Sequence, residues 1–511
     1  MKTTMVRGRT IVSGVGPGGN AVQVDDAAVL VRDGTIVEVG PARDLPAPDG
    51  ADVIGGDDFV VLPGFVNAHH HVGLTPLQLG APDLPLELWA NYRLGARRVD
   101  IYLDTLYSAL ELVRSGVTTV QHLHNRVAGG VAEVATGARE VIRAYRDIGM
   151  RVSYSYGMRD QNRIVYTDDE TFYARLPDDL AESLRATVGA QALSADENLE
   201  VFRILSAEFP DADDVAVQLA PLNFQWCSDS ALEQVAALSH ERGTPVHLHL
   251  LETPYQRAYA RKRTGGSALG HLDRMELLNE RMTLGHGVWT TADDLDLIAE
   301  RNTSICHNCS SNLRLQSGLA PVGAMLERGI RVALGIDEAG MNDDRDMLLE
   351  MRQVLRTHRV PGHQARVPSV AEVFRMATES GAGTTGFGAR IGRIEPGRAA
   401  DLVLMRWSRI AGPFLDPDVG VLDAVVQRGK TDAVDTVLIG GVPVLRDGRF
   451  TRIDEEAALR ELADFMARPA DEDERRRRAM SRRLMPHIET FYEDWLAEEP
   501  FEPYDFRNSR R

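Results

Sequence analysis

Short apolar runs alternate with helical patterns through most of the chain, and this alternation limits the possible folds more than any other feature. The runs are almost continuously apolar, as in strands buried on both faces. The segments between them, such as DSALEQVAALSHERG, have apolar residues at helical spacing and end at typical helix stops, here Gly243. Strands are expected at 61–68, 116–123, 151–157, 215–220, 245–250, 282–286, 302–306 and 331–336. Eight strands that alternate with helices predict an α/β protein with a (β/α)8 TIM barrel over residues 61–387.

Both ends of the chain are rich in β-type residues and contain tight-turn signals. Asp33-Gly34 separates two such runs in VLVRDGTIVEVG, and Asp447-Gly448 stands in a similar position in GVPVLRDGRF. This dipeptide between β-rich runs is a strong hairpin signal. The two regions could be unrelated surface hairpins, but we favour one composite β-sandwich built from residues 1–60 and 388–451.

The remaining residues, 452–511, are predicted to form a charged, helical C-terminal extension. Four consecutive arginines, residues 475–478, could bind an anionic partner, but the acidic residues just upstream favour a solvated helix face. Phe491, Tyr492 and Trp495 could anchor the extension on the barrel or on a second subunit.

Length and composition narrow the class of protein. The chain of 511 residues can bury a large core, and 43% hydrophobic with 26% charged residues is ordinary for a soluble globular protein. The net charge of -18 argues against a nucleic-acid partner. Three cysteines, Cys227, Cys306 and Cys309, suit a reducing cytoplasm. The N-terminus lacks the apolar core of a signal peptide, and no apolar stretch of about 18 residues predicts a membrane span.

Side chains that bind metals stand at the downstream ends of several predicted strands. His69 and His71 close PGFVNAHHH, His249 lies in HLHLLET, His286 in LGHGV and Asp337 in LGIDEAG. Catalytic residues of parallel α/β barrels occupy this end of the strands. Because a strand repeats every two residues, His69 and His71 project to the same side and can bind one ion. The pattern therefore predicts a metal-dependent hydrolytic enzyme.

The residue types also indicate the chemistry. Three neutral imidazoles and the carboxylate of Asp337 leave an open position on zinc, which lowers the pKa of bound water to about 7, although iron(II) would accept the same ligands. Glu252, three residues after His249, is expected to shuttle protons without binding the metal. His286 could bind a metal, or it could hydrogen-bond the attacking oxygen and polarise the substrate. His70 points the other way, and His247 is favoured as a buried, hydrogen-bonded histidine.

Together these motifs resemble those of a known family, the amidohydrolase superfamily. The similar branch contains cytosine deaminase-like, guanine deaminase-like and triazine hydrolase proteins. PGFVNAHHH is similar to that branch's PGFVNxHxH, HLHLLET to its HxxET, and CHNCSSNLRLQSGLAPV to its HNPxSNxxLxSGxAPV. LGHGV, LGIDEAG and GRIEPGRAADLVLM continue the match in order, so it spans nearly the whole chain.

The resemblance implies one metal ion held by His69, His71, His249 and Asp337, with Glu252 and His286 acting on water and substrate. Binuclear members carboxylate a lysine on strand four, and VAVQLAPL contains no lysine. The resemblance also argues against a separate zinc site at the CxxC of Cys306 and Cys309, because Cys309 stands where relatives usually have proline. Loop residues Asn308, Ser311 and Asn312 would instead shape the surroundings of the metal.

Departures from the family pattern suggest candidates for substrate binding. His122 stands where many relatives have aspartate, so His122 and His124 could line the pocket. Glu338 stands where relatives often have a small residue, and we hypothesise that it binds a cationic or amino-bearing substrate. Weaker candidates for the pocket are Trp89, Arg159, Asn162, Arg163 and Asn308.

The favoured reaction is attack of metal-bound hydroxide on a ring carbon of a small nitrogen heterocycle, with ammonia as the leaving group. Glu252 would protonate the adjacent nitrogen and Asp337 would take the proton of water. Nucleobase-like, pterin-like and triazine-like substrates are expected. The alternatives are release of halide, cleavage of a urea, carbamate or cyclic amide, and a non-catalytic binding protein. The family resemblance also suggests a homodimer.

Overall fold

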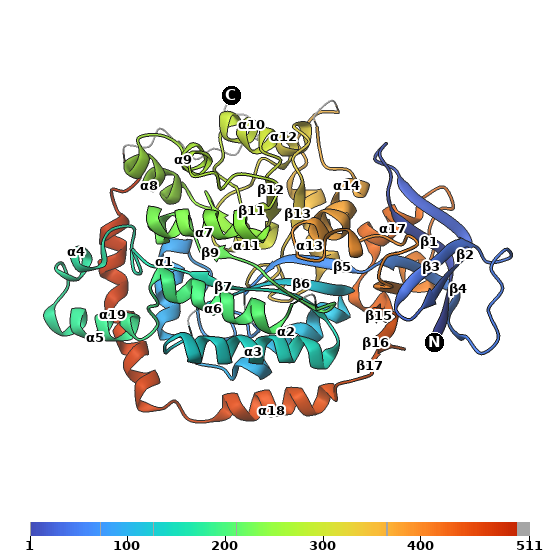
Figure 1. Ribbon diagram of the computed structural model, residues 1–511, viewed down its shortest axis with the longest axis horizontal. Coiled ribbons are helices and arrows are strands. Elements are labelled where there is room, and N and C mark those ends of the chain that lie inside the picture. The colour runs from blue at the N-terminus through green and yellow to red at the C-terminus, as the bar shows by residue number, and fades with distance from the viewer. Residues whose placement is uncertain (1, 72, 126, 211, 364–365, 498–511) are drawn as a thin grey trace.

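The computed structural model describes residues 2–71, 73–125, 127–210, 212–363 and 366–497 (Figure 1). Its central part consists of two sheets of parallel strands, with orders β5-β6-β7-β8 and β10-β11-β12-β13, and a short strand β9 that pairs with β7. Isolated parallel bridges, Leu219–Val246 and His70–Asp337, connect the two sheets at both edges. The bounds are β5 (Phe65–His70), β6 (Val117–His124), β7 (Arg151–Met158), β8 (Val215–Val217), β9 (Ala220–Pro221), β10 (Val246–Leu250), β11 (Met282–His286), β12 (Ser304–His307) and β13 (Val332–Leu334).

Within the described residues each of the eight predicted runs contains a strand, but the run 215–220 is divided between β8 and β9. The backbone N–H of Gln218 still donates to Tyr154 of β7 at 2.8 Å, whereas that of Leu219 donates to Pro245 at 3.1 Å. The chain thus bonds to a neighbouring strand on each side, and it pairs with β7 again at Ala220 and Pro221 of β9.

Helices follow most of the parallel strands (Figure 1). The helix predicted in DSALEQVAALSHERG forms and ends at Gly243, whose φ of 64° is the left-handed conformation of a typical helix stop. The bounds are α1 (Leu86–Tyr92), α2 (Ile101–Arg114), α3 (Val131–Ile148), α4 (Asp169–Tyr173), α5 (Asp178–Gly189), α6 (Ala195–Glu208), α7 (Asp229–Arg242), α8 (Pro254–Thr264), α9 (Ala268–Arg274), α10 (Ala292–Glu300), α11 (Cys309–Arg314), α12 (Val322–Glu327), α13 (Met347–Thr357), α14 (Val370–Arg375) and α15 (Gly381–Gly383), the last two joined by a π-helical turn, Met376–Ser380.

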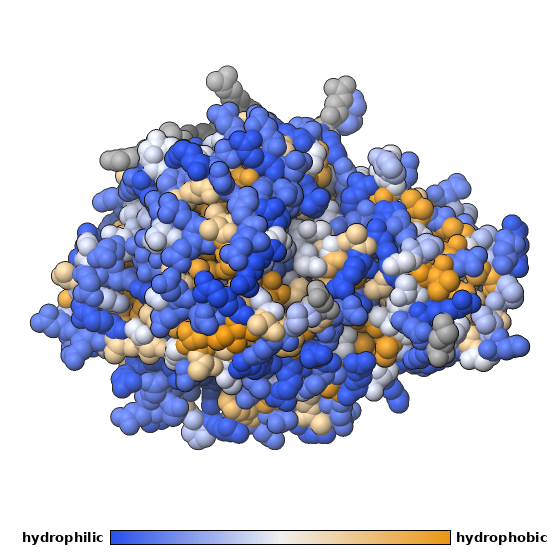
Figure 2. Space-filling model, in the orientation of Figure 1, coloured by the Kyte–Doolittle hydropathy of each residue, from blue (hydrophilic) through white to orange (hydrophobic). Residues whose placement is uncertain are grey.

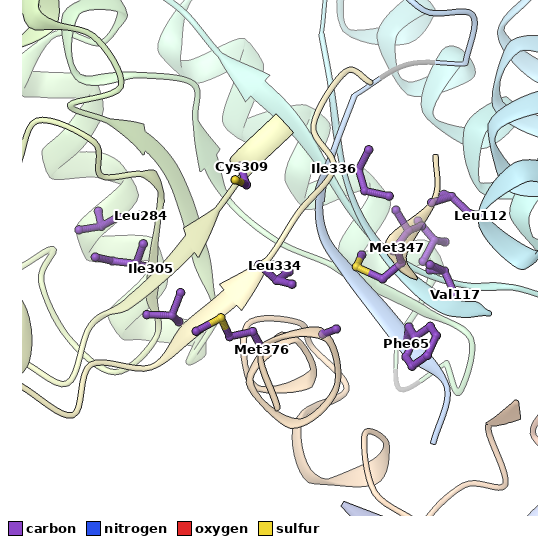
Figure 3. Close-up of a cluster of buried hydrophobic side chains, with 14 of the residues drawn as sticks. Phe65, Leu112, Val117, Leu284, Ile305, Cys309, Leu334, Ile336, Met347 and Met376 are labelled. Atoms are coloured by element: carbon purple, nitrogen blue, oxygen red, sulfur yellow. The ribbon is translucent and has the colours of Figure 1, made fainter. Parts of the chain in front are cut away.

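The largest apolar cluster lies between these strands and helices. Figure 3 shows part of it, where Ile305 of β12 and Leu334 of β13 lie near Met376, and Phe65 of β5 lies on the other side. Burial of continuous apolar strands on both faces explains why the runs lack polar alternation.

The two ends of the chain share one mixed sheet, with the order β17-β16-β15-β14-β4-β1-β2-β3. Its N-terminal and C-terminal halves meet where β4 pairs antiparallel with β14. Both Asp-Gly turns form as predicted, since Asp33, Gly34, Asp447 and Gly448 all have positive φ angles. The bounds are β1 (Thr3–Val15), β2 (Ala21–Arg32), β3 (Thr35–Pro41), β4 (Asp52–Pro63), β14 (Leu402–Arg406), β15 (Val434–Ile439), β16 (Val442–Arg446) and β17 (Arg449–Phe450), with α16 (Trp407–Ala411) and α17 (Val421–Arg428) between β14 and β15.

A buried ion pair ties the mixed sheet to the parallel strands. Arg151, the first residue of β7, donates to both carboxylate oxygens of Asp401 at 2.7 and 3.1 Å. The same carboxylate accepts the backbone N–H of Gly440 at 2.7 Å. Because the contact is bidentate, it orients the mixed sheet relative to the start of β7.

The C-terminal extension contains α18 (Glu455–Ala467) and α19 (Glu472–Tyr492), drawn in red in Figure 1. The apolar side of α19, including Leu484 and Tyr492, packs in a cluster with Ile164 and Leu180. Trp495 donates from its indole nitrogen to the carbonyl oxygen of Tyr255 at 3.2 Å. The aromatic residues therefore anchor the extension on its own chain.

The arginine run at residues 475–478 is compensated locally, as predicted. Arg476 and Arg477 pair with Asp473, and Arg478 pairs with Glu474. Figure 2 shows hydrophilic residues over most of one face, with apolar residues scattered among them. In the part of the chain that the structure describes, no helix is both long enough and apolar enough to cross a bilayer.

Candidate metal and catalytic site

Three histidine rings meet at the carboxyl ends of the parallel strands. His69 lies near the end of β5, His71 is the first residue after it, and His249 lies near the end of β10 in the other parallel sheet. Nε2 of His71 lies 3.1 Å from Nε2 of His69 and 3.0 Å from Nε2 of His249. All three side chains are buried. The prediction that His69 and His71 project to the same side is confirmed.

Backbone carbonyl groups orient two of these rings. Nδ1–H of His71 donates to the carbonyl oxygen of Leu123 at 2.7 Å, and Nδ1–H of His249 donates to that of Leu222 at 2.6 Å. Because a carbonyl oxygen can only accept, Nδ1 carries the proton and each Nε2 presents a lone pair. Both rings are therefore oriented as metal-binding histidines usually are.

Two further histidines support this group. Nε2 of His247 lies 2.8 Å from Nδ1 of His69, which agrees with its prediction as a buried, hydrogen-bonded residue. Nδ1 of His70 donates to the carbonyl oxygen of Asp337 at 3.1 Å, on the opposite side of the strand. The first contact joins β5 to β10, and the second joins β5 to the segment after β13.

The carboxylate of Asp337 faces the same rings. One of its oxygens lies 3.3 Å from Nε2 of His71 and 3.7 Å from Nε2 of His69, and the other accepts the hydroxyl of Ser311 at 2.7 Å. Asp337 has a φ of 64°, in the left-handed region that residues other than glycine rarely adopt. Such strain is often found at functional sites.

The donor atoms fit a divalent metal ion. Those of His69, His71 and Asp337 all lie within 4.8 Å of one another. Two nitrogen ligands about 2.0–2.1 Å from zinc lie about 3 Å apart when the angle between them is near 100°. Burial, with smaller contributions from neighbouring histidines, lowers the pKa of His69 and of His249 well below the usual value. The rings of His69 and His249 are therefore neutral, as metal ligation requires.

His286, the last residue of β11, faces this group. Its Nε2 lies 3.6 Å from an oxygen of Asp337 and 3.7 Å from an oxygen of Glu252. Its Nδ1 lies 2.8 Å from the side-chain oxygen of Asn312, and Nδ2 of Asn308 lies 3.3 Å from its Nε2. The two asparagines therefore hold the imidazole between the two carboxyl groups.

Glu252 is a buried carboxyl group two residues after β10. Its backbone N–H donates to Gln256 at 2.9 Å, and the hydroxyl of Ser317 lies 3.5 Å from its Oε1. Burial first, and then the charge of Asp337, raises the pKa of Glu252 well above its usual value. A carboxyl group with a raised pKa can hold and transfer a proton near neutral pH.

A cavity opens beside these groups, with about 1250 Å³ of empty space including its open mouth. It is lined by His71, His249, Glu252, His286 and Asp337. Trp89, Arg159, Arg163 and Glu338, which the sequence predicted as substrate-binding, also line it. Glu338 is already paired with Arg93, so its charge is neutralised before any substrate binds.

Four other predicted substrate-binding residues, His122, His124, Asn162 and Asn308, do not line the cavity. Nδ1 of His122 lies 2.9 Å from the hydroxyl of Tyr145, and Nδ1 of His124 lies 3.0 Å from that of Tyr154. These contacts direct both rings toward α3 and β7. Asn308 contacts His286, so its position suits orientation of that ring.

Glu87 and Tyr166 also line the cavity, although no sequence motif predicted them as site residues. The carboxyl group of Glu87 accepts the hydroxyl of Tyr166 at 2.8 Å and that of Thr253 at 2.5 Å. Burial raises the pKa of Glu87. A single acidic residue within the apolar stretch PLELW was the available signal.

The CxxC cysteines do not act as a pair. In the described residues, Cys309 belongs to a group of potential ligands with His307 and His358, and Cys306 belongs to none. Cys306 instead packs in a small apolar cluster with Ala68 and Ala333.

Comparisons with known proteins agree with this geometry. Residues 60–444 match the model of the amidohydrolase family. A 5'-deoxyadenosine deaminase from Methanothermobacter thermautotrophicus is 30% identical over 445 residues, which cover 86% of this chain and 94% of that protein. An adenosine deaminase structure from Xanthomonas campestris with bound zinc is 28% identical, with a TM-score of 0.77 over 91% of this chain and 97% of that one.

An atrazine chlorohydrolase structure from Arthrobacter aurescens shares the fold, with a TM-score of 0.78 at 21% identity over 91% of this chain and 100% of that one. Since the family model covers most of the chain, this protein belongs to the amidohydrolase family and is a hydrolase that acts on carbon–nitrogen bonds.

Proposed function

We propose that this protein is a metal-dependent aminohydrolase that releases ammonia from a nitrogen heterocycle, with an aminated purine nucleoside as the favoured substrate. The main support is the convergence of three histidine Nε2 atoms and Asp337 beside Glu252 in one cavity. The deaminases of 5'-deoxyadenosine and adenosine among its relatives support both the leaving group and the ring.

The metal would be held by His69, His71, His249 and Asp337, with one ion per chain, zinc favoured and iron(II) as the alternative. Three imidazoles and one carboxylate are a suitable donor set for zinc. When bound, the ion would supply a Lewis acid that activates water at neutral pH.

The surrounding residues would move the protons. Asp337 would accept the proton of the attacking water, and Glu252 would protonate the ring nitrogen next to the attacked carbon. His286, held by Asn312, would hydrogen-bond the attacking oxygen. The proton on Asp337 would then pass to the departing amino group, and the hydroxyl proton of the adduct would return to Glu252 as the carbonyl forms. Water and the aminated ring would thus become a ring carbonyl and ammonia.

We also propose that the parallel strands close into a (β/α)8 barrel over residues 61–387. The bridges Leu219–Val246 and His70–Asp337, at both edges of the parallel sheets, support closure. Residues 1–60 and 388–451 would form the composite β-sandwich, supported by their shared mixed sheet. Residues 452–511 would form the extension, of which the part beyond residue 497 lies outside the described residues.

A cytoplasmic location and a homodimer stay predictions. The buried thiols of Cys227, Cys306 and Cys309 suit a reducing compartment. Because Leu484 and Tyr492 are buried against their own chain, a dimer would need another surface.

The test is a screen of the zinc-loaded enzyme against adenosine, 5'-deoxyadenosine, guanine, aminopterins and chlorinated triazines. Ammonia and product mass are recorded together. Ammonia with a mass increase of about one unit, from exchange of NH2 for OH, would support deamination. Halide release, or cleavage of a urea or cyclic amide without deamination, would contradict it.

A further inference from the structure

Arg159, the residue after β7, has an unusual environment. It lines the cavity that also contains Glu252, His286 and Asp337. Its guanidinium carbon lies 4.3 Å from the centre of the Trp226 ring, and one terminal nitrogen donates to the carbonyl oxygen of Asn162 at 3.1 Å. Its Nε is buried and has no hydrogen-bond partner among the described residues.

Other arginines of the cavity wall are paired with carboxylates. Arg93 pairs with Glu338, and Arg163 pairs with Asp169 at 3.5 Å. Arg159 makes no ion pair within the described part of the chain. Burial lowers its pKa to about 10, with opposition from Asp169, so the guanidinium stays charged at neutral pH. The wall thus contains a cation with a buried donor that none of the described residues satisfies.

An unpaired buried cation is unfavourable unless a ligand compensates it. Two of the acidic groups in the wall, Glu87 and Glu338, would oppose an anionic ligand only weakly. Glu338 is neutralised by Arg93, and burial raises the pKa of Glu87, which favours its uncharged form. A planar guanidinium stacked on an aromatic ring is also well arranged to bind a carboxylate or phosphate through two hydrogen bonds.

We propose that Arg159 and Trp226 form an anion subsite, so that the substrate is an aminated heterocycle bearing a carboxylate or phosphate group. This rests on the proposed function for the ring chemistry. The anion would accept from the unpaired donors of Arg159, while the aminated ring lies beside Glu252 and His286.

The test compares adenosine, adenosine 5'-carboxylate and adenosine 5'-monophosphate. Dissociation constants are measured by calorimetry with the zinc-loaded Glu252→Gln protein, in which turnover is suppressed. At least one anionic probe should bind more than about tenfold more tightly than adenosine, as expected for charge-assisted hydrogen bonds. The better of the two anions identifies the group as carboxylate or phosphate.

Arg159→Met, introduced into the same protein, should reduce the ratio of the dissociation constant of adenosine to that of the anionic probe to about one. Arg159→Lys should keep part of it, because lysine retains the charge but not the planar fork. Arg185→Met is the matched control, because Arg185 lies on α5, pairs with Glu170 at 2.7 Å and does not line the cavity. It should leave the ratio unchanged.

Equal binding of neutral and anionic probes, failure of both anions to bind, or a ratio that survives Arg159→Met would overturn the subsite. These outcomes differ from failure of the proposed function. If the native enzyme deaminates adenosine without preferring an anion, the function stands and the subsite fails. If anions bind through Arg159 but no probe is deaminated, the subsite stands and nucleoside deamination fails.

Discussion

Nε2 of His71 and Nε2 of His249 lie 3.0 Å apart, although Nδ1 of each ring donates to a backbone carbonyl group on the other side. Two facing lone pairs at this separation repel each other unless a cation lies between them. This relationship is the strongest structural reason to expect a metal ion, and the first prediction follows from it.

His71→Ala should reduce the metal content from about one equivalent per chain to a small fraction and abolish turnover, because one nitrogen ligand is lost. Metal is measured by mass spectrometry after dialysis. His240→Ala, on the exposed side of α7, should retain full metal content and activity. Retention of one equivalent by His71→Ala would contradict the ligand assignment, and two equivalents in the native protein would contradict a single site.

Glu252→Gln should lower kcat by about 10²–10⁴-fold, because the amide cannot transfer the proton. The variant should keep its metal, since Glu252 lies outside the groups of candidate ligands found among the described residues. Steady-state kinetics and metal analysis of the same preparation separate these effects. Loss of metal together with activity would show instead that Glu252 is a ligand.

Leu484→Ala should lower the free energy of unfolding by about 2–5 kcal/mol, because this fully buried side chain joins α19 to the rest of the chain. It should also raise KM, since Tyr492 at the end of the same helix lines the cavity. Denaturant unfolding and kinetics measure the two effects. Leu459→Ala, on the more exposed α18, is the control and should change neither. An unchanged KM in a destabilised Leu484→Ala enzyme would show that α19 does not shape the substrate site.

Glu350 should make stability depend on pH. It accepts the backbone N–H of Ser310 at 3.0 Å, and burial raises its pKa to about 7 from 4.5. Between these values the folded state binds more protons than the unfolded state. The contribution of Glu350 to the free energy of unfolding is therefore fully present below about pH 4.5 and is lost as pH rises through about 7. At about 1.4 kcal/mol per pKa unit the loss is on the order of 3 kcal/mol.

Glu350→Gln should remove this dependence, as measured by unfolding at several pH values between 5 and 8. Glu456→Gln, at an exposed position of α18, provides the comparison and should follow the native profile. A Glu350→Gln profile parallel to that of the native protein would rule out the linkage.

Much of the candidate site was predictable because its residues follow local rules. The period of a strand places His69 and His71 on one side, and apolar runs mark the strands whose carboxyl ends carry His249, His286 and Asp337. The same rules did not place His122 and His124. Both also lie near the end of a strand, but their rings contact the hydroxyl groups of Tyr145 and Tyr154 and do not line the cavity.

The sequence by itself determined which side chains could bind a metal, the order of the strands that carry them, and the pairing of the arginines in α19 with acidic residues one turn away. These depend on spacings of a few residues. Only the tertiary structure decided that Arg93 neutralises Glu338, that Arg159 remains without a carboxylate partner among the described residues, and that Tyr492 joins the cavity wall. Such contacts join residues far apart in the chain, so they depend on how loops and the C-terminal extension pack against the strands.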